Sequence, residues 1–200
     1  MVKRLEEMTL QELWELFPIT LVPHDDRWAQ WASGEMARLK ASVFGRVGAE
    51  VHHVGSTAVK GIWAKPIIDL LVEADPADFG ELKHCLLQAG WRCMNEAERR
   101  LSFNKGYTPA GYAEQVFHLH LRARGDNDEV YFRDYLNAHA DVAKQYESLK
   151  LSLWKRYEHD RDGYTEAKTD FVRHYTVVAK TAATAGFSET QCAACRHGNK

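Results

Sequence analysis

Two spacings of apolar residues alternate along the chain and predict its elements. An apolar residue at every third or fourth position, the period of one helix face, marks the beginning and the last third of the sequence. Short apolar runs bounded by Gly, Pro or Asp, typical of strands, fill the part between them. We expect helices at 4–17, 27–44, 77–89, 129–139, 141–158 and 162–184. We expect strands at 50–54, 65–74, 91–95, 99–107 and 115–123.

Two of these strands have informative patterns. The run at 65–74 is almost continuously apolar, as in a strand covered on both faces, yet it contains Asp69. The run at 115–123 alternates strictly, so His118 and His120 share one face and apolar residues occupy the other. Since one crossover helix interrupts the strands, we expect an α+β fold, a mixed sheet flanked by helices with a C-terminal helical segment.

The composition suits one globular domain, because 45% of the 200 residues are apolar and 27% are charged. We place this domain at 20–185, after an N-terminal helical extension at 1–19 and before a flexible tail at 186–200. The net charge of -2 gives no overall basic field, so duplex nucleic acid is not an expected partner. No apolar run reaches membrane-spanning length and the N-terminus lacks a signal-peptide core, so we expect a cytoplasmic protein with no membrane partner. The oligomeric state stays open.

The expected tail contains a C-x-x-C motif, formed by Cys192 and Cys195. A tetrahedral zinc site needs four ligands, and no second pair accompanies these two. We therefore favour two thiols on a mobile tail over half a zinc site or a redox pair.

The stretch from His53 to Glu73 carries the most distinctive chemistry. Gly55 allows a tight turn after a strand, and Ser56 and Thr57 follow with amides and hydroxyls that suit a phosphate. Asp69 lies inside an apolar strand, where a carboxylate is costly unless it is paired, hydrogen-bonded or bound to a cation. We expect the turn to hold a phosphate, and Asp69 either to hold a cation or to cap the turn.

A Gly-Ser turn followed about a dozen residues later by an acidic strand resembles the nucleotidyltransferase fold. That resemblance implies a triphosphate at the loop and magnesium on strand carboxylates, where the metal stabilises in-line displacement. One feature departs from it. The usual second acid, two residues after the first, is Leu71 here, and Glu73 lies four residues after Asp69.

A wider set of motifs in the same order resembles the GrpB family, of the UPF0157 type, over about residues 20–180. The motifs are HVGSTAV with AKPIIDLLV, then FHLHL, then FRDYLNAH. Members are similar to nucleotidyltransferases in fold and occur alone or fused to other domains, including dephospho-coenzyme A kinase. Lys60 replaces a Pro that is usual after the GSTAV segment. The resemblance implies site residues at Gly55, Ser56, Thr57, Lys65, Asp69, His118 and His120.

The two histidines give the site alternative chemistries. If strand 115–123 lies beside strand 65–74, Asp69, His118 and His120 form a catalytic metal set of two imidazoles and one carboxylate, with His53 as a fourth member. Such ligands favour Mn, Zn or Fe over Mg, whereas the nucleotidyltransferase resemblance implies Mg; we expect Mg or Mn ahead of Zn. Alternatively one histidine is a general base tuned by Asp69, or both only bond across the sheet.

Several cations are candidates for the same ligand. Arg99, Arg100 and Lys105 either surround an anion or are surface charges. Tyr164 and Lys168, four apart on one helix face, form either a wall of the same pocket or a solvated pair. We include Arg100 and Lys168 with Lys65 among the phosphate-binding residues.

The leading hypothesis is binding of a small phosphorylated ligand, a nucleotide above all, with metal-dependent nucleotidyl or phosphoryl transfer. Two alternatives stay open. Leu71 in place of the second acid would suit a noncatalytic ligand-sensing or partner-docking module. Asp69, His118 and His120 would suit a metal-dependent hydrolase.

Overall fold

The fold is built on one five-stranded mixed sheet. The computed structural model describes the backbone of residues 3–195 and the side chains of residues 3–42 and 44–185. The strands stand in the order β1-β2-β5-β4-β3, and β2 and β5 are parallel while the other neighbours are antiparallel. Their bounds are β1 Glu50–Val54, β2 Ile68–Ala74, β3 Arg92–Ala97, β4 Arg100–Thr108 and β5 Gly111–Ala123.

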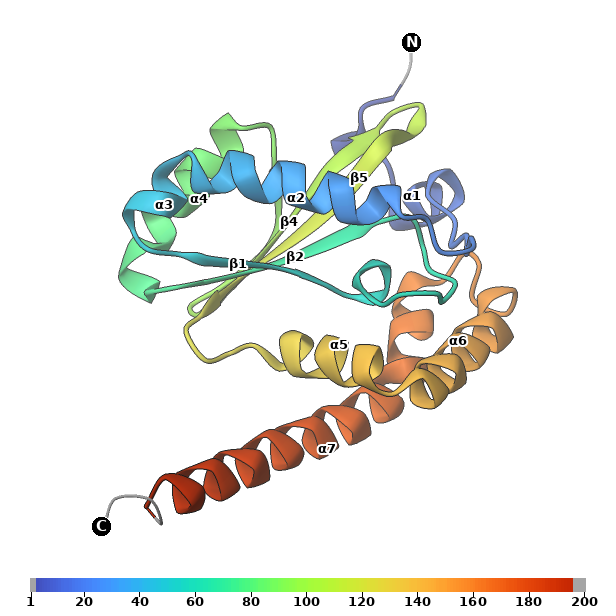
Figure 1. The fold of residues 1–200 in the computed structure, drawn as a ribbon. Coiled ribbons are helices and arrows are strands. Elements are labelled where there is room, and N and C mark those ends of the chain that lie inside the picture. Colours follow the sequence, from blue (N-terminus) through green and yellow to red (C-terminus); the bar gives the residue numbers. More distant parts are fainter. Residues whose placement is uncertain (1–2, 196–200) are drawn as a thin grey trace.

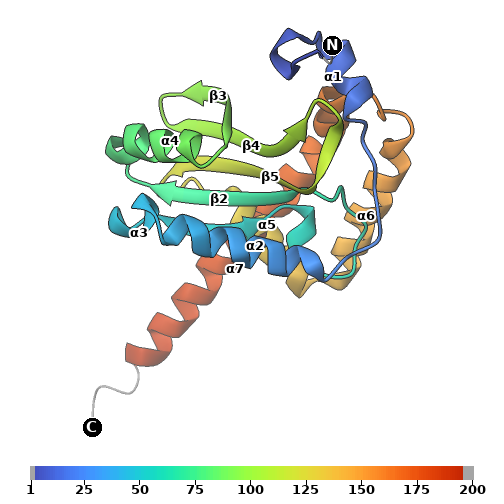
Figure 2. The same ribbon diagram turned by 90° about the horizontal axis from the view of Figure 1, so that it is seen from above.

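One face of the sheet is apolar and is covered by three helices. These are α2 (Arg27–Lys40), α3 (Val43–Arg46) and α4 (Phe79–Gln88), which lie on the same side of the strands in Figures 1 and 2. Leu70 of β2 and Leu119 of β5 point into this layer and are fully buried. The alternation of β2 and β5 therefore directs one set of side chains into the main core.

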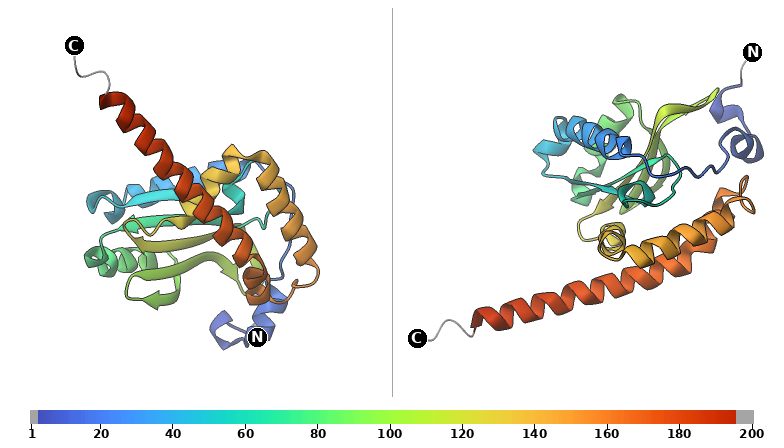
Figure 3. Two further views of the ribbon diagram at one scale, coloured as in Figure 1. Left: turned by 90° about the horizontal axis from the view of Figure 1, so that it is seen from below. Right: turned by 45° about the vertical axis from the view of Figure 1, so that its right-hand side comes forward.

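The other face of the sheet is polar and is covered by the C-terminal helices. These are α5 (Asp128–Ala138), α6 (Ala140–Trp154) and α7 (Arg161–Cys195). Figure 3 shows α7 crossing beneath the sheet and continuing past α5. The three helices pack on one another through a second cluster that includes Phe132, Leu136 and Tyr146. Because this cluster lies mainly among the helices, the sheet face above it stays available to polar side chains.

The register of the sheet brings the predicted motifs together. Asp69 of β2 stands opposite His118 of β5, and Leu71 stands opposite His120. The condition set by the sequence, that the FHLHL strand lies beside the Asp69 strand, is met. The α+β class with a mixed sheet, flanking helices and a helical C-terminal segment is confirmed.

Some boundaries differ from those expected. The single N-terminal helix expected at 4–17 is wrong: a 3₁₀ turn (Leu5–Glu7) and α1 (Leu10–Leu16) replace it, because Thr9 and Glu12 form a reciprocal capping box. Strand β2 begins at Ile68 because Pro66 lies in a tight turn in which Ile67 N donates to Lys65 O at 2.8 Å. Strand β5 starts earlier than expected, and α7 runs past residue 184 to Cys195. The side chains of Cys192 and Cys195 lie outside the described residues.

Among the described helices, none combines the length and apolar character needed to cross a lipid bilayer.

Replacing Leu70 with Ala tests the main core. Leu70 is fully buried between the sheet and its apolar helix layer. The cavity left by Leu70→Ala is expected to lower the free energy of unfolding by about 2–5 kcal/mol. Urea denaturation measures it, with Leu10→Ala as control, because Leu10 is 58% exposed. Equal losses in both variants would contradict this assignment of the core.

Candidate functional site

A cavity of about 860 Å³ lies between the polar face of the sheet and helices α5 to α7. Its sheet side is formed by the turn after β1 and by Asp69, His118 and His120. Its helix side carries Lys150 of α6 together with cationic and apolar side chains of α5 and α7. The cavity thus joins segments far apart in sequence, including all the elements that carry the predicted motifs.

The floor of the cavity depends on a close approach between Gly55 and Asp69. Gly55 follows β1 with φ 72°, in the left-handed region that favours glycine. A Cβ at this position would lie 2.2 Å from Asp69 Oδ2. The sequence predicted Gly55 for its backbone freedom. Glycine is also required here because any side chain would displace the Asp69 carboxylate.

Asp69 is held by a chain of hydrogen bonds that starts on α7. Arg161 Nη2 donates to Tyr107 OH at 2.9 Å, and Tyr107 OH lies 2.7 Å from His118 Nε2. His118 Nδ1 lies 3.3 Å from Asp69 Oδ1. All donors point towards the carboxylate if the His118 proton is on Nδ1, a tautomer assigned from this network. Burial raises the pKa of Asp69, but the His118 hydrogen bond and nearby positive charges outweigh it and hold this pKa below its usual range.

Three lysines on different elements converge on the same end of the cavity. Lys65 precedes β2, Lys150 lies on α6 and Lys168 lies on α7. Burial and, to a smaller extent, the charge of Arg161 lower the pKa of Lys65 to about 8. Burial, with the repulsion of Lys65, lowers the pKa of Lys150 and of Lys168 to about 7. Burial and mutual repulsion thus disfavour the charged forms of these lysines, and an anionic ligand beside them would stabilise those forms.

Two tyrosines form the walls between these lysines. Lys168 Nζ lies 4.0 Å and Lys65 Nζ 5.3 Å from the ring centroid of Tyr164. The Tyr164 side chain is 1% exposed, and its hydroxyl finds no hydrogen-bond partner among the described residues. Tyr146 lies beside Lys150 and shares a hydrogen bond with Ser56. Burial raises the pKa of Tyr146 to about 12. A buried hydroxyl without a partner indicates a polar group that a ligand can satisfy.

The predicted turn residues have different surroundings. Ser56 lines the cavity, whereas Thr57 is 3% exposed and donates to Ile67 O at 3.2 Å. His53 Nε2 lies 3.0 Å from Thr57 Oγ1. Because the Thr57 hydroxyl proton is used on Ile67, His53 donates to it, which places the ring proton on Nε2. His53 and Thr57 therefore stabilise the turn by bonding to each other and to Ile67, and His53 lies on the face of the sheet opposite to Asp69.

The other predicted residues lie further from Asp69 or are already paired. His120 lines the cavity, but its Nδ1 faces Arg122 Nη2 at 3.2 Å and Ser102 Oγ at 3.5 Å. Arg100 lines the outer end, where it makes two bonds to Asp126 at 2.6 and 2.7 Å. Lys105 lies on the opposite face of the sheet, where it pairs with buried Glu35.

The predicted metal set is only partly assembled. Asp69 and His118 are in contact, but both ring nitrogens of His118 already have neighbours, Asp69 and Tyr107. In the part of the chain that the structure describes, these two and His120 do not form a group whose ligand atoms all lie within 4.8 Å of one another. A metal on Asp69, His118 and His120 stays a prediction, and it would require His118 to release one neighbour.

Four residues of the site were not predicted from the sequence: Tyr107, Tyr146, Lys150 and Arg161. A signal existed for Lys150, because it continues the helix face formed by Val142 and Tyr146, both buried. A lysine that continues an apolar stripe has at least its aliphatic stem against the apolar surface. Arg161 begins α7 and had no comparable signal.

Comparisons with known proteins give consistent results. A family profile described as "GrpB protein" matches residues 18–177. A UPF0157 protein of Pseudomonas aeruginosa is 36% identical, covering 77% of this chain and 64% of its own length. The glutamate-rich protein GrpB of Alkalihalophilus pseudofirmus is 35% identical, covering 77% of this chain and 91% of its own length.

One solved structure has the same fold. The crystal structure of conserved protein GrpB from Enterococcus faecalis superposes with a TM-score of 0.70 at 24% identity, over 82% of this chain and 99% of that one. The Cid1 poly(U) polymerase has a TM-score of 0.48 at 12% identity, over 71% of this chain and 43% of that one.

Acid is expected to destabilise the protein through two half-buried histidines. Burial lowers the pKa of His53 and of His120 to about 4 from an ordinary value of 6.5. Between pH 6.5 and 4 the unfolded chain therefore binds more protons at these positions, so stability falls as the pH falls. Urea denaturation at pH 7, 6 and 5 measures this loss. His120→Asn should give a shallower pH dependence, and exposed His139→Asn should not. An unchanged slope in His120→Asn would contradict the assignment.

Proposed function

Since the chain belongs to the GrpB protein family, we propose that its cavity binds a nucleotide or another small phosphorylated ligand and transfers a nucleotidyl or phosphoryl group from it. The observation that carries this proposal is the convergence of Lys65, Lys150 and Lys168 beside Asp69. The three lysines facing Asp69 at one end of a confined space suit a polyanion better than a neutral ligand.

The positions of the charged side chains determine how the proposed ligand would be oriented in the cavity. Its phosphates would lie at the end formed by the three lysines, where the hydroxyl of Tyr164 offers a further hydrogen bond. The Gly55–Thr57 turn supports this position. The hydrogen bonds that close the turn are donated by Ala58 N and Val59 N, so they do not use the amides at the start of the turn, which could bind a phosphate. The part of the ligand beyond the phosphates would contact the apolar side chains of Phe132 and Leu136 on α5.

The donors near Asp69 fit one divalent ion but not two. Leu71 occupies the position of a second carboxylate. Glu73 lies further along β2, where its carboxylate accepts from Gly125 N at 2.7 Å and Asn127 Nδ2 at 3.1 Å. We propose that Asp69, together with phosphate oxygens, would hold one Mg²⁺ or Mn²⁺, since both prefer oxygen ligands. Such an ion would neutralise negative charge on the phosphates.

The protein's own groups can position and stabilise the transfer. His118 orients the Asp69 carboxylate, and Tyr107 and Arg161 orient His118. In the proposed step an acceptor hydroxyl oxygen bonds to a phosphorus atom, its proton passes to solvent or a base, and the pyrophosphate or nucleoside diphosphate departs. Lys168 and Lys150 would stabilise the charge that gathers on this leaving group.

A second candidate is binding without catalysis. Leu71 removes a carboxylate that two-metal transfer would require, and His118 has a neighbour at each ring nitrogen. A cavity of the same charge could then sense a phosphorylated ligand. This alternative shares the ligand class with the first and differs from it only in turnover.

Lysine variants test the ligand class. Lys168→Met removes a cation from the proposed phosphate end, and we expect affinity for a nucleoside triphosphate to fall at least about tenfold, which corresponds to about 1.4 kcal/mol. Isothermal titration with each of the four common nucleoside triphosphates measures it. Lys155→Met is the matched control, because Lys155 is exposed and lies beside Glu158. An equal effect of both substitutions would contradict the phosphate end assigned here.

Asp69→Asn separates catalysis from binding. We expect it to abolish turnover of radiolabelled nucleoside triphosphates with Mg²⁺ or Mn²⁺ while nucleotide binding stays within about tenfold, because the lysines remain. Binding without turnover in the parent protein would favour the noncatalytic candidate. Neither binding nor turnover with any of the four nucleotides would overturn the proposed function.

A further inference from the structure

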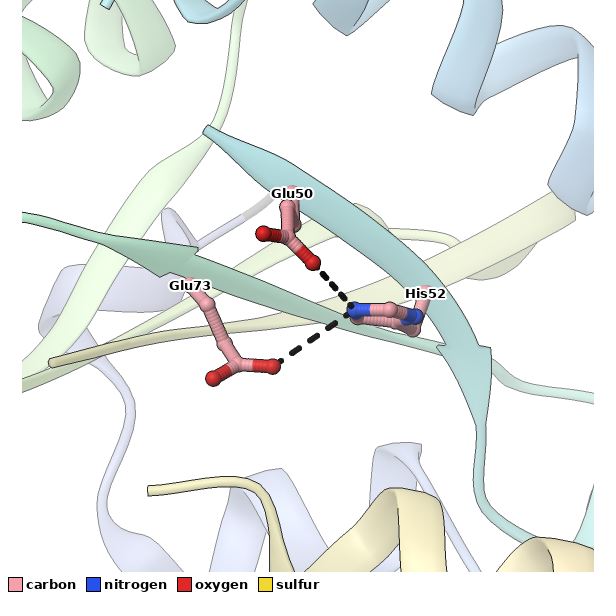
Figure 4. Close-up of side chains that lie close together, drawn as sticks. All are labelled: Glu50, His52 and Glu73. Atoms are coloured by element: carbon pink, nitrogen blue, oxygen red, sulfur yellow. Dashed lines mark ion pairs between the residues drawn. The ribbon is translucent and has the colours of Figure 1, made fainter. Parts of the chain in front are cut away.

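A second group of metal-ligating side chains lies on the polar face of the sheet, away from the lysine end of the cavity. Figure 4 shows Glu50 and His52 of β1 and Glu73 of β2 directed towards one another. Glu50 stands opposite Glu73 in the register, and His52 stands opposite Leu71. Asp69 lies four residues before Glu73 on the same strand, a separation of about 13 Å. The group is therefore distinct from the cavity floor around Asp69.

The spacing of its ligand atoms fits a single metal ion. His52 Nε2 lies 3.5 Å from Glu73 Oε1 and 3.9 Å from Glu50 Oε2. In the part of the chain that the structure describes, this is the set of three such residues whose ligand atoms all lie within 4.8 Å of one another. Ligands about 2.0–2.1 Å from a tetrahedral zinc are separated from one another by roughly 3.3 Å. Small side-chain movements would close the set around an ion.

The state of His52 Nε2 is a separate observation that points to a ligand. This nitrogen is buried from solvent and has no hydrogen-bond partner among the described residues. Its neighbours are the two carboxylates, with which it forms the ion pairs drawn in Figure 4 but no hydrogen bond. A buried polar atom without a partner is costly and requires an explanation, of which a bound ion is one.

The oxygens that do not face His52 are held by other groups. Glu73 Oε2 accepts from Gly125 N at 2.7 Å, and Glu50 Oε1 accepts from Arg124 Nη1 at 3.4 Å. Glu50 is thus held through the oxygen that faces away from His52. Glu73 is held at both oxygens, because its Oε1, which faces His52, also accepts from Asn127 Nδ2 at 3.1 Å. Outer donors of this kind orient the ligands of protein metal sites.

We propose that Glu50, His52 and Glu73 form a binding site for one divalent first-row transition metal such as zinc. One imidazole nitrogen and two carboxylate oxygens are ligands that zinc accepts, and three protein ligands leave a position for water. The ion would join β1 to β2 and, through Glu73, to the β5–α5 connection at Gly125 and Asn127. Asp126 and Asp128 of the same segment line the outer end of the cavity, so the metal would fix one of its edges.

Zinc titration tests this site. The full chain, with Cys192→Ser and Cys195→Ser to remove the tail thiols, is dialysed against a chelator and titrated with ZnCl₂ by calorimetry. We expect one Zn²⁺ per chain and a higher melting temperature with zinc. His52→Ala should lower the affinity by about 100-fold or more, because even changes outside the ligand set cost 10–100-fold at metal sites. Glu50→Gln should also weaken binding and remains usable if His52→Ala does not fold, since Glu50 is 63% exposed.

Two controls locate the ion. His159→Ala should bind zinc as the parent does, because His159 faces one carboxylate, Glu15, and not two. Asp69→Asn should also keep zinc binding, because Asp69 belongs to the cavity floor. Absence of zinc binding in the parent, unchanged affinity in both His52→Ala and Glu50→Gln, or loss of zinc in Asp69→Asn would overturn the proposal. None of these results depends on nucleotide binding.

Discussion

The contact between Gly55 and the Asp69 carboxylate is the constraint on which the site depends. It fixes the end of β1 against the start of β2, so the turn and the acid form one surface. The hydrogen-bond chain from Arg161 through Tyr107 and His118 then ends on that acid from the opposite direction. The carboxylate thus fits against Gly55, which has no side chain to displace it, and is held from the other direction by His118. These contacts fix its position without a second acid beside it.

The two faces of the sheet have different physical roles. The face covered by α2, α3 and α4 is closed by aliphatic packing, which stabilises the domain. The face covered by α5, α6 and α7 holds buried charge, which costs stability in the absence of a ligand. Positions that oppose folding in this way are typical of functional sites, because the surrounding structure must compensate for them.

The order of the motifs predicted the family, and periodicity with local chemistry predicted the α+β class and the strands that carry Asp69 and His118. That these two strands are neighbours was only a condition of the metal hypothesis, and the register meets it. The predicted elements depend on short-range patterns: alternation assigns each side chain to a face of the sheet, and Gly55 marks the turn. The roles of His53 and Thr57 could not be predicted this way, because the 3₁₀ turn directs Thr57 back towards β2. Lys150 and Arg161 join the site only through the packing of α6 and α7 under the sheet, and the sequence pattern does not determine how helices dock. Tyr107 lies on β4 and reaches His118 through the pairing of β4 with β5.

The parallel pairing of β2 with β5 has a kinetic consequence. The two strands become neighbours only after α4, β3 and β4 have been placed between them in the chain, so closing this pair requires a long loop. A partly folded chain can hold its helices and hairpin while Asp69 and His118 are still apart. A ligand that binds in this cavity would therefore require the completely folded chain, and once bound it would shield the molecule from proteases that cleave its opened forms.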